Sequence, residues 1–192
     1  MSMYCETNPT GTAAGMAARF AALVPVLTTE RLTLRAPQAA DFALYAEIAC
    51  GPRSKGIGGP MTRDEAWYDF ATLASCWMLR GHGGWTITLT RTGAPIGFAL
   101  IGAEPGDQAP ELGYLLIEAQ EGQGYATEAA EAVRDYAFGT LRLPELVSYI
   151  APGNARSVAV AERLGAIRSG NVTYPEGDTP ALVYRHPSPE DV

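Results

Sequence analysis

Two glycines in the middle of the chain follow an apolar run and come directly before an alanine-rich helical pattern. Gly122 and Gly124 allow the backbone to turn sharply and let its N–H groups approach a ligand closely. The N-terminus of the helix that follows adds N–H groups without intrahelical partners and a partial positive charge. We therefore expect this strand, turn and helix to bind an anion, most naturally a phosphate.

Two common phosphate-binding motifs do not fit this turn. A Walker loop requires Gly-Lys-Ser or Gly-Lys-Thr, and the sequence contains no such triplet. A dinucleotide-binding fingerprint requires glycine or alanine where this chain has Thr127, and an acidic residue at the end of the next strand, which is missing. The turn is therefore expected to belong to another class of phosphate-binding site.

The elements that position this turn follow from alternating and helical patterns of apolar residues. Strands are predicted at residues 29–35, 85–90, 95–101, 111–117, 145–151, 166–169 and 182–185. Helices are predicted at residues 16–24, 41–48, 62–78, 126–140 and 154–164. Strands first and strand–helix–strand–helix units afterwards predict a mixed α/β sheet with helices on both sides.

The composition is that of a soluble globular protein. With 192 residues the chain can bury a self-sufficient core, and we expect a flexible, partly helical arm at residues 1–27 and a single domain at residues 28–192. The formal charge of −7 argues against nucleic-acid binding and suits a cationic substrate. The absence of a membrane-spanning run or secretory signal predicts a cytoplasmic protein. Three scattered cysteines and the isolated His82 and His186 do not suggest a metal site.

Four motifs follow one another along the chain. They are Thr-Glu-Arg-Leu-Thr-Leu-Arg from Thr29, Glu-Leu-Gly-Tyr from Glu111, Gly-Gln-Gly-Tyr-Ala-Thr-Glu-Ala from Gly122, and Asn-Ala-Arg-Ser from Asn154, whose helix ends in Glu-Arg-Leu-Gly. Together they resemble the GNAT superfamily of acetyl-coenzyme A dependent N-acetyltransferases, specifically its RimJ/RimL-like branch. The resemblance covers residues 28–185.

This resemblance implies a mostly antiparallel twisted sheet of about six to seven strands, splayed between the fourth and fifth strands, with helices on both faces. Acetyl-coenzyme A is then the cofactor. Its pantetheine arm is expected to pair with the backbone of residues 115–117, and its pyrophosphate with the N–H groups of residues 123–127. The implied cofactor-binding residues are Leu115, Leu116, Ile117, Gly122, Gln123, Gly124, Tyr125, Ala126, Thr127, Asn154 and Ser157.

The resemblance also implies the catalytic residues. Glu111 would be the general base, drawing a proton from the amine through a water, and a salt-bridged strand carboxylate is the competing interpretation. Ser157 would donate to the leaving thiolate or bond the cofactor, unless it only caps its helix or faces solvent. Two positions depart from the family pattern: Glu121 stands where glutamine or arginine is usual, and Ala161 where a tyrosine often protonates the thiolate. We expect the Glu121 side chain to point to solvent.

The predicted function is transfer of an acetyl group from acetyl-coenzyme A to a primary amine, either a protein N-terminus or a small molecule, by direct attack in a ternary complex. A non-catalytic acyl-coenzyme A binding module or sensor is the alternative. We expect a monomer or homodimer without nucleic-acid, membrane or metal partners. Candidates for the wall of the acceptor pocket are Tyr114, Trp85, Tyr125 and the loop at residues 54–60, together with Tyr174 and Glu176.

Overall fold

The structure is a computed structural model that describes residues 3–173 and 180–188. Its strands are β1 Leu27–Thr28, β2 Leu32–Arg35, β3 Gly84–Leu89, β4 Pro95–Gly102, β5 Glu111–Leu116, β6 Val147–Ile150, β7 Ile167–Val172 and β8 Ala181–Arg185. Its α-helices are α1 Gly11–Ala21, α2 Phe42–Ala49, α3 Arg63–Arg80, α4 Tyr125–Gly139 and α5 Ala155–Arg163. Short 3-10 turns are η1 Tyr4–Glu6, η2 Ala39–Asp41, η3 Ser54–Ile57 and η4 Glu118–Gln120. Tyr174 and Glu176, two predicted acceptor-pocket residues, lie outside the described residues.

In the described part of the chain, eight strands form one sheet in the order β1-β2-β3-β4-β5-β6-β8-β7. Strands β1 to β5 run antiparallel to their neighbours, and so do β6, β8 and β7. Between them, β5 and β6 run parallel and share a single registered pair, Glu111 with Val147. This confirms the mixed sheet and its splay. The count of six to seven strands is corrected to eight, because the two-residue β1 is too short to show a period.

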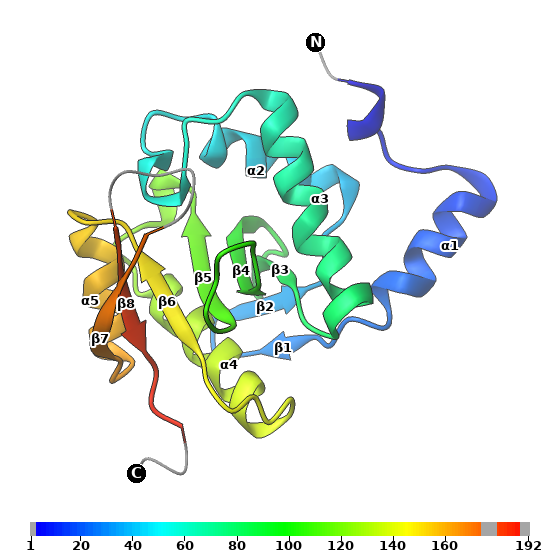
Figure 1. Cartoon of the computed structure of the whole chain (residues 1–192). Coiled ribbons are helices and arrows are strands. Elements are labelled where there is room, and N and C mark those ends of the chain that lie inside the picture. Colours follow the sequence, from blue (N-terminus) through cyan, green and yellow to red (C-terminus); the bar gives the residue numbers. More distant parts are fainter. Residues whose placement is uncertain (1–2, 174–179, 189–192) are drawn as a thin grey trace.

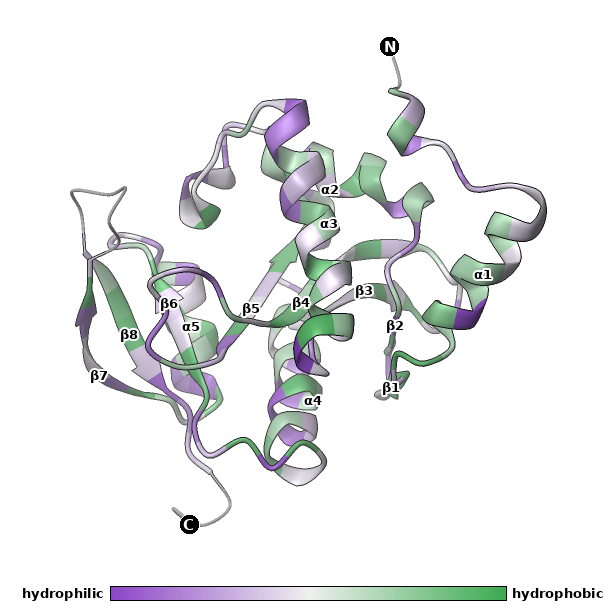
Figure 2. Cartoon of the chain, turned by 45° about the vertical axis from the view of Figure 1, so that its right-hand side comes forward, coloured by the Kyte–Doolittle hydropathy of each residue, from purple (hydrophilic) through white to green (hydrophobic). Residues whose placement is uncertain are grey.

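Helices cover both faces of the sheet, as predicted (Figure 1). α4 packs on one face, in a core that includes Ala99 and Leu112, whereas α2 and α3 pack on the other face against Phe98 and Leu115. The inner strand β4 is coloured mainly as hydrophobic in Figure 2. Because side chains alternate between faces along a strand, Glu111 shares the face of Leu115 and points toward α2 and α3.

The start of α3 confirms a predicted capping box. The Glu65 N–H donates to Thr62 Oγ1 at 3.3 Å, and the Thr62 N–H donates to Glu65 Oε2 at 2.7 Å. Gly81 ends the helix with a left-handed φ of 74°. Both ends of α3 are therefore set by local sequence.

The N-terminal segment differs from the prediction in where its helix lies. α1 begins at Gly11, so the predicted helix at residues 16–24 is shifted toward the N-terminus. Consecutive alanines extend the helical run through a segment whose glycine and threonine content suggested a loop. Before α1, Glu6 pairs with Arg63 of α3 at 2.6 Å (Oε1 to Nε). No helix in the described residues is long and apolar enough to cross a bilayer.

Candidate active site

The candidate site lies where β5 and β6 separate. Val147 N donates to Pro110 O at 3.0 Å, and in a regular parallel ladder the next bond would run from Tyr149 N to Leu112 O. Here the Tyr149 N–H donates to the Glu111 carboxylate, and the Leu112 carbonyl accepts from Ser148 Oγ at 2.7 Å. Hydrogen bonds to side chains thus replace the backbone hydrogen bonds that would continue the ladder, and a gap opens between the two strands.

Glu111 has an unusual ionisation for a carboxyl group. Burial raises its pKa to about 8, the nearby carboxylates of Asp107 and Glu104 raise it further in the same direction, and the Tyr149 N–H acts against them. At neutral pH the group is therefore mainly protonated and close to its midpoint. A carboxyl group with such a pKa is well matched to proton transfer near neutral pH.

The face of the sheet around Glu111 is acidic. Tyr45 of α2 donates a hydrogen bond to Asp69 of α3, and burial raises the pKa of Asp69. Burial and the charge of Asp69 likewise raise the pKa of Glu104. These groups share the α2–α3 face with Glu111, so an approaching cation would relieve their mutual repulsion.

The turn after β5 contains both predicted glycines and leads directly into α4. Gly122 and Gly124 adopt left-handed φ angles of 73° and 83°, conformations that favour glycine. The first intrahelical bond of α4 runs from Glu128 N to Gly124 O at 3.0 Å. The N–H groups of Tyr125, Ala126 and Thr127 precede that bond and have no acceptor within the helix, so the donor set fits a pyrophosphate.

The N-terminus of α5 forms the opposite wall of the gap. Asn154 caps the helix, its Oδ1 accepting from Ser157 N at 3.2 Å. Tyr114 of β5 reaches across and donates through its hydroxyl to Ser157 O at 2.9 Å. Asn154, Ser157 and Tyr114 therefore lie together, with the Ser157 side chain partly buried.

Comparison with known proteins identifies the family to which this arrangement belongs. Residues 31–167 match the acetyltransferase (GNAT) domain. The chain belongs to the GNAT acetyltransferase family. Acetyl-coenzyme A is the acetyl donor in this family of acetyltransferases.

Solved structures and curated relatives agree with this assignment. A crystal structure of an acetyltransferase from Agrobacterium tumefaciens C58 is 46% identical, with a TM-score of 0.80, and the match covers 86% of this acetyltransferase and 95% of that chain. RimL, a ribosomal L7/L12 alpha-N-protein acetyltransferase solved with coenzyme A, shares the fold at 20% identity, with a TM-score of 0.70 over 85% of this chain and 98% of RimL. Bacillus subtilis YkkB is 36% identical over 78 residues, so the match spans 41% of this chain and only 44% of YkkB. An N-acetyltransferase named p20, from Bacillus licheniformis, is 28% identical over 150 residues, which cover 75% of this chain and 83% of p20.

The predicted pantetheine strand of this acetyltransferase needs a correction. Ile117 N donates to Ile96 O of β4 at 3.0 Å, so its N–H is not available to a ligand in the gap. Because bonding direction alternates along an antiparallel ladder, Leu115 also directs its backbone groups toward β4. The residues whose backbone groups face the gap are Tyr114 and Leu116.

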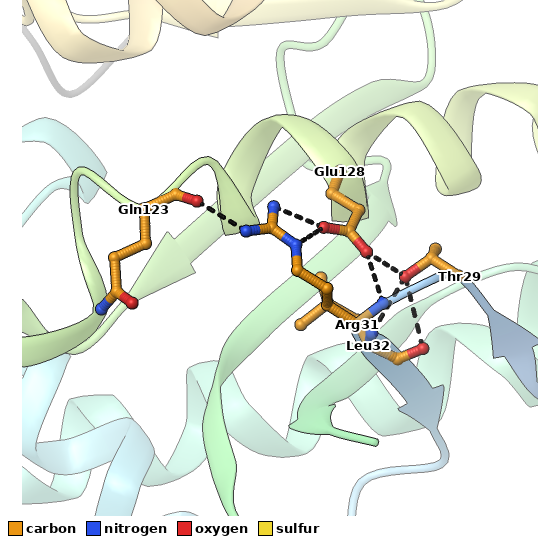
Figure 3. A network of polar contacts seen from close by, with 5 residues as sticks. All are labelled: Thr29, Arg31, Leu32, Gln123 and Glu128. Atoms are coloured by element: carbon orange, nitrogen blue, oxygen red, sulfur yellow. Dashed lines mark hydrogen bonds and ion pairs between the residues drawn. The ribbon is translucent and has the colours of Figure 1, made fainter. Parts of the chain in front are cut away.

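Arg31 contacts both the glycine turn and the first turn of α4, an arrangement that the sequence did not reveal (Figure 3). Its Nη1 donates to Gln123 O at 3.0 Å, and its Nε donates to Glu128 Oε2 at 2.6 Å. The guanidinium also lies 4.6 Å from the centre of the Tyr125 ring. Thr29 donates to the second oxygen of Glu128. Arg31 belongs to the Thr-Glu-Arg-Leu motif quoted above, and its place in that motif was the only sign in the sequence that it could make such contacts.

Three other predicted positions of the acetyltransferase are now placed. Ala161 is fully buried in a cluster with Ile150 and Tyr184, so the position that often carries tyrosine here serves packing. Trp85 is also fully buried and donates to Pro25 O at 2.7 Å, which excludes it from the acceptor wall. Glu121 does not simply face solvent, because two arginines pair with its carboxylate.

The two histidines of the acetyltransferase take structural positions. His82 Nδ1 lies 2.8 Å from Ile101 O, and His186 Nε2 lies 3.0 Å from Ser148 Oγ. Burial, together with the charge of Arg134, lowers the pKa of His186 to about 4, so the ring is neutral at pH 7. Within residues 3–173 and 180–188, no group of three metal-binding side chains is arranged to hold an ion.

Proposed function

We propose that this acetyltransferase moves the acetyl group of acetyl-coenzyme A to a primary amine by direct attack in a ternary complex. The observation that carries the proposal is the Glu111 carboxyl group, which stands at the fork of β5 and β6 with a pKa of about 8. A base at this point adjoins both the gap and the acidic face on which an amine would approach.

Acetyl-coenzyme A, when bound, supplies the acetyl thioester. We assign the backbone groups of Tyr114 and Leu116 to its pantetheine arm and the N–H groups of Gln123, Tyr125, Ala126 and Thr127 to its pyrophosphate. Asn154 completes the cofactor site from α5. This division follows from which backbone groups lack partners in the sheet and in the first turn of α4.

The chemical step requires proton movements at the amine and at the thiolate. A cationic amine first gives one proton to the carboxylate form of Glu111, directly or through a water, because only the neutral amine can attack. The amine nitrogen then forms the new bond to the acetyl carbon and the carbon–sulfur bond breaks. The leaving thiolate takes a proton, for which we assign the Ser157 hydroxyl, and the second proton of the nitrogen returns to the serine through solvent. Ala161 has no group to offer, whereas Ser157 lies one turn earlier on the same side of α5.

The acceptor is proposed to be cationic before it reacts. Asp69, Glu104 and Glu111 lie on one face, and burial raises the pKa of each carboxyl group. A cation bound beside them would favour their charged forms. A protein N-terminus is the first acceptor to test, because RimL, which shares the fold, is named for that reaction. A small amine fits the same electrostatics. We further propose a cytoplasmic monomer or homodimer.

The experiment is an assay of thiol release from acetyl-coenzyme A across a panel of peptides with free N-termini and small polyamines. The expected result is saturable release that depends on the amine, with the acetylated amine identified by mass spectrometry. Coenzyme A binding is measured in parallel by calorimetry. Tight binding without turnover on any amine would instead support the acyl-coenzyme A sensor.

A further inference from the structure

Two arginines converge on one carboxylate oxygen beside the phosphate-binding turn. Arg53, in the connection between α2 and α3, and Arg156, in the first turn of α5, both pair with Oε2 of Glu121. Arg53 also pairs with Glu118 of η4. Two guanidinium groups directed at a single oxygen form a clamp for an anion, and here Glu121 occupies it.

The clamp lies at the edge of the cofactor site. Glu121 directly precedes Gly122, the first glycine of the turn. The connection that carries Arg53 also touches the cap of α5, since a Cβ placed on Gly56 would lie 2.5 Å from Asn154 Nδ2. Figure 1 shows this connection, in cyan, on the same side of the molecule as the start of α5. Three elements therefore meet here.

Folding stability does not account for the convergence. The Arg156 side chain is 71% exposed, and an ion pair in that setting contributes little to the stability of a protein. Holding two guanidinium groups side by side also brings like charges together, which only an anion between them offsets.

The charge balance of the protein makes such a clamp useful. The chain has a formal charge of −7, whereas coenzyme A carries a pyrophosphate and a 3′-phosphate. Arg31, the other arginine at the turn, is already paired with Glu128. Arg53 and Arg156 instead pair with Glu121, the residue directly before the turn.

We infer that Arg53 and Arg156 bind a phosphate group of coenzyme A, and that Glu121 occupies them until the cofactor arrives. The inference rests on the family's use of acetyl-coenzyme A. It also explains how this chain can have glutamate at a position for which the family resemblance implies glutamine or arginine: the positive charge comes from the two neighbouring elements instead of from the turn.

The test is calorimetric binding of coenzyme A, dephospho-coenzyme A and pantetheine to the full chain. The variants are Arg53→Gln, Arg156→Gln and Glu121→Gln, with Arg91→Gln as a control of equal charge change in the exposed β3–β4 turn. Removal of either clamp arginine should weaken coenzyme A binding about tenfold, the effect of one charge-assisted hydrogen bond, and leave pantetheine binding unchanged. Glu121→Gln should bind coenzyme A more tightly than the unaltered protein.

The three ligands separate the possible sources of the effect. A loss that persists with dephospho-coenzyme A assigns the arginines to the pyrophosphate, and a loss that disappears assigns them to the 3′-phosphate. Unchanged coenzyme A affinity in both arginine variants, an equal loss in Arg91→Gln, an equal loss with pantetheine, or weaker binding by Glu121→Gln would overturn the inference. If the unaltered protein bound no coenzyme A, the cofactor assignment itself would fail.

Discussion

The Ser148 hydroxyl donates to the Leu112 carbonyl oxygen at 2.7 Å at the place where β5 and β6 separate. The same hydroxyl lies 3.0 Å from His186 Nε2, so a side-chain link from the end of β8 joins the two strands where their ladder stops. The gap in the sheet is therefore bounded by a buried polar link. The gap that we propose for the cofactor therefore has a defined edge.

Replacement of Ser148 by alanine should destabilise the protein. The buried Leu112 carbonyl and His186 Nε2 would both lose this partner, at a cost of about 1–3 kcal/mol in the free energy of unfolding. Urea unfolding measures the change. Ser169→Ala is the matched control, because that serine is exposed and its bond to Val183 O is 3.4 Å long. Equal stabilities of the two variants would contradict this account of the gap.

Glu111 should make stability fall as pH rises. Its folded pKa of about 8 lies above the ordinary value of 4.5, so between these pH values the folded protein binds more protons than the unfolded chain. Stability is then lost as pH rises from 4.5 to 8. Glu111→Gln lacks the titrating group, so its stability should not fall in this way. The melting temperature of the variant should therefore rise relative to that of the unaltered protein as pH increases from 5 to about 8. A constant difference across this range would show that the carboxyl group is not perturbed.

Arg31→Ala should loosen the phosphate-binding turn. Loss of the bonds to Gln123 O and Glu128 leaves the N–H groups of the turn less well ordered, and coenzyme A binding should weaken about tenfold. Arg31→Lys should bind coenzyme A nearly as weakly as Arg31→Ala, because an ammonium group cannot make both contacts in the same geometry.

Binding of pantetheine, which lacks the pyrophosphate, distinguishes this effect from general damage to the fold. It should be unchanged in Arg31→Ala, and the control Arg19→Ala, at an exposed position of α1, should bind coenzyme A normally. Equal losses for both ligands would mean that Arg31 serves only the fold.

Ser157→Ala should slow turnover without weakening cofactor binding. If the hydroxyl protonates the leaving thiolate, its loss should lower kcat about a hundredfold. The main-chain bonds of Ser157 to Asn154 and Tyr114 do not involve the hydroxyl and are retained. Steady-state kinetics and calorimetry together make the test. An unchanged kcat would remove Ser157 from the mechanism.

The sequence was sufficient where the signal was local. The glycine turn, the capping box at Thr62 and the cap at Asn154 depend on a few adjacent residues, and the structure confirms each of them. The order of strands and helices likewise follows from periodicity. The splay between β5 and β6 was predicted from the family resemblance. The structure confirms it, because the two strands share only one registered pair.

The remaining features depend on contacts between distant parts of the chain. Arg31 reaches Glu128 and Gln123 across about half of the sequence, and no periodic pattern records such a pairing. Backbone direction in β5 depends on the register with β4, which decides that Tyr114 and Leu116, rather than Leu115 and Ile117, face the gap. The partners of Glu121, Arg53 and Arg156, also lie on distant parts of the chain, so the sequence did not predict these ion pairs.

The role of Glu111 as the base can be tested by the pH dependence of kcat/KM for one alkylamine acceptor, measured in the unaltered enzyme and in Glu111→Gln. An alkylamine titrates near pH ~10, so its own ionisation is separated from that of a carboxyl group with a pKa of about 8. If Glu111 is the base, the rate should rise through pH 8 in the unaltered enzyme, and in the variant it should be about a hundredfold lower with that rise missing. Equal rates and the same profile in both proteins would contradict the assignment of Glu111 as the base.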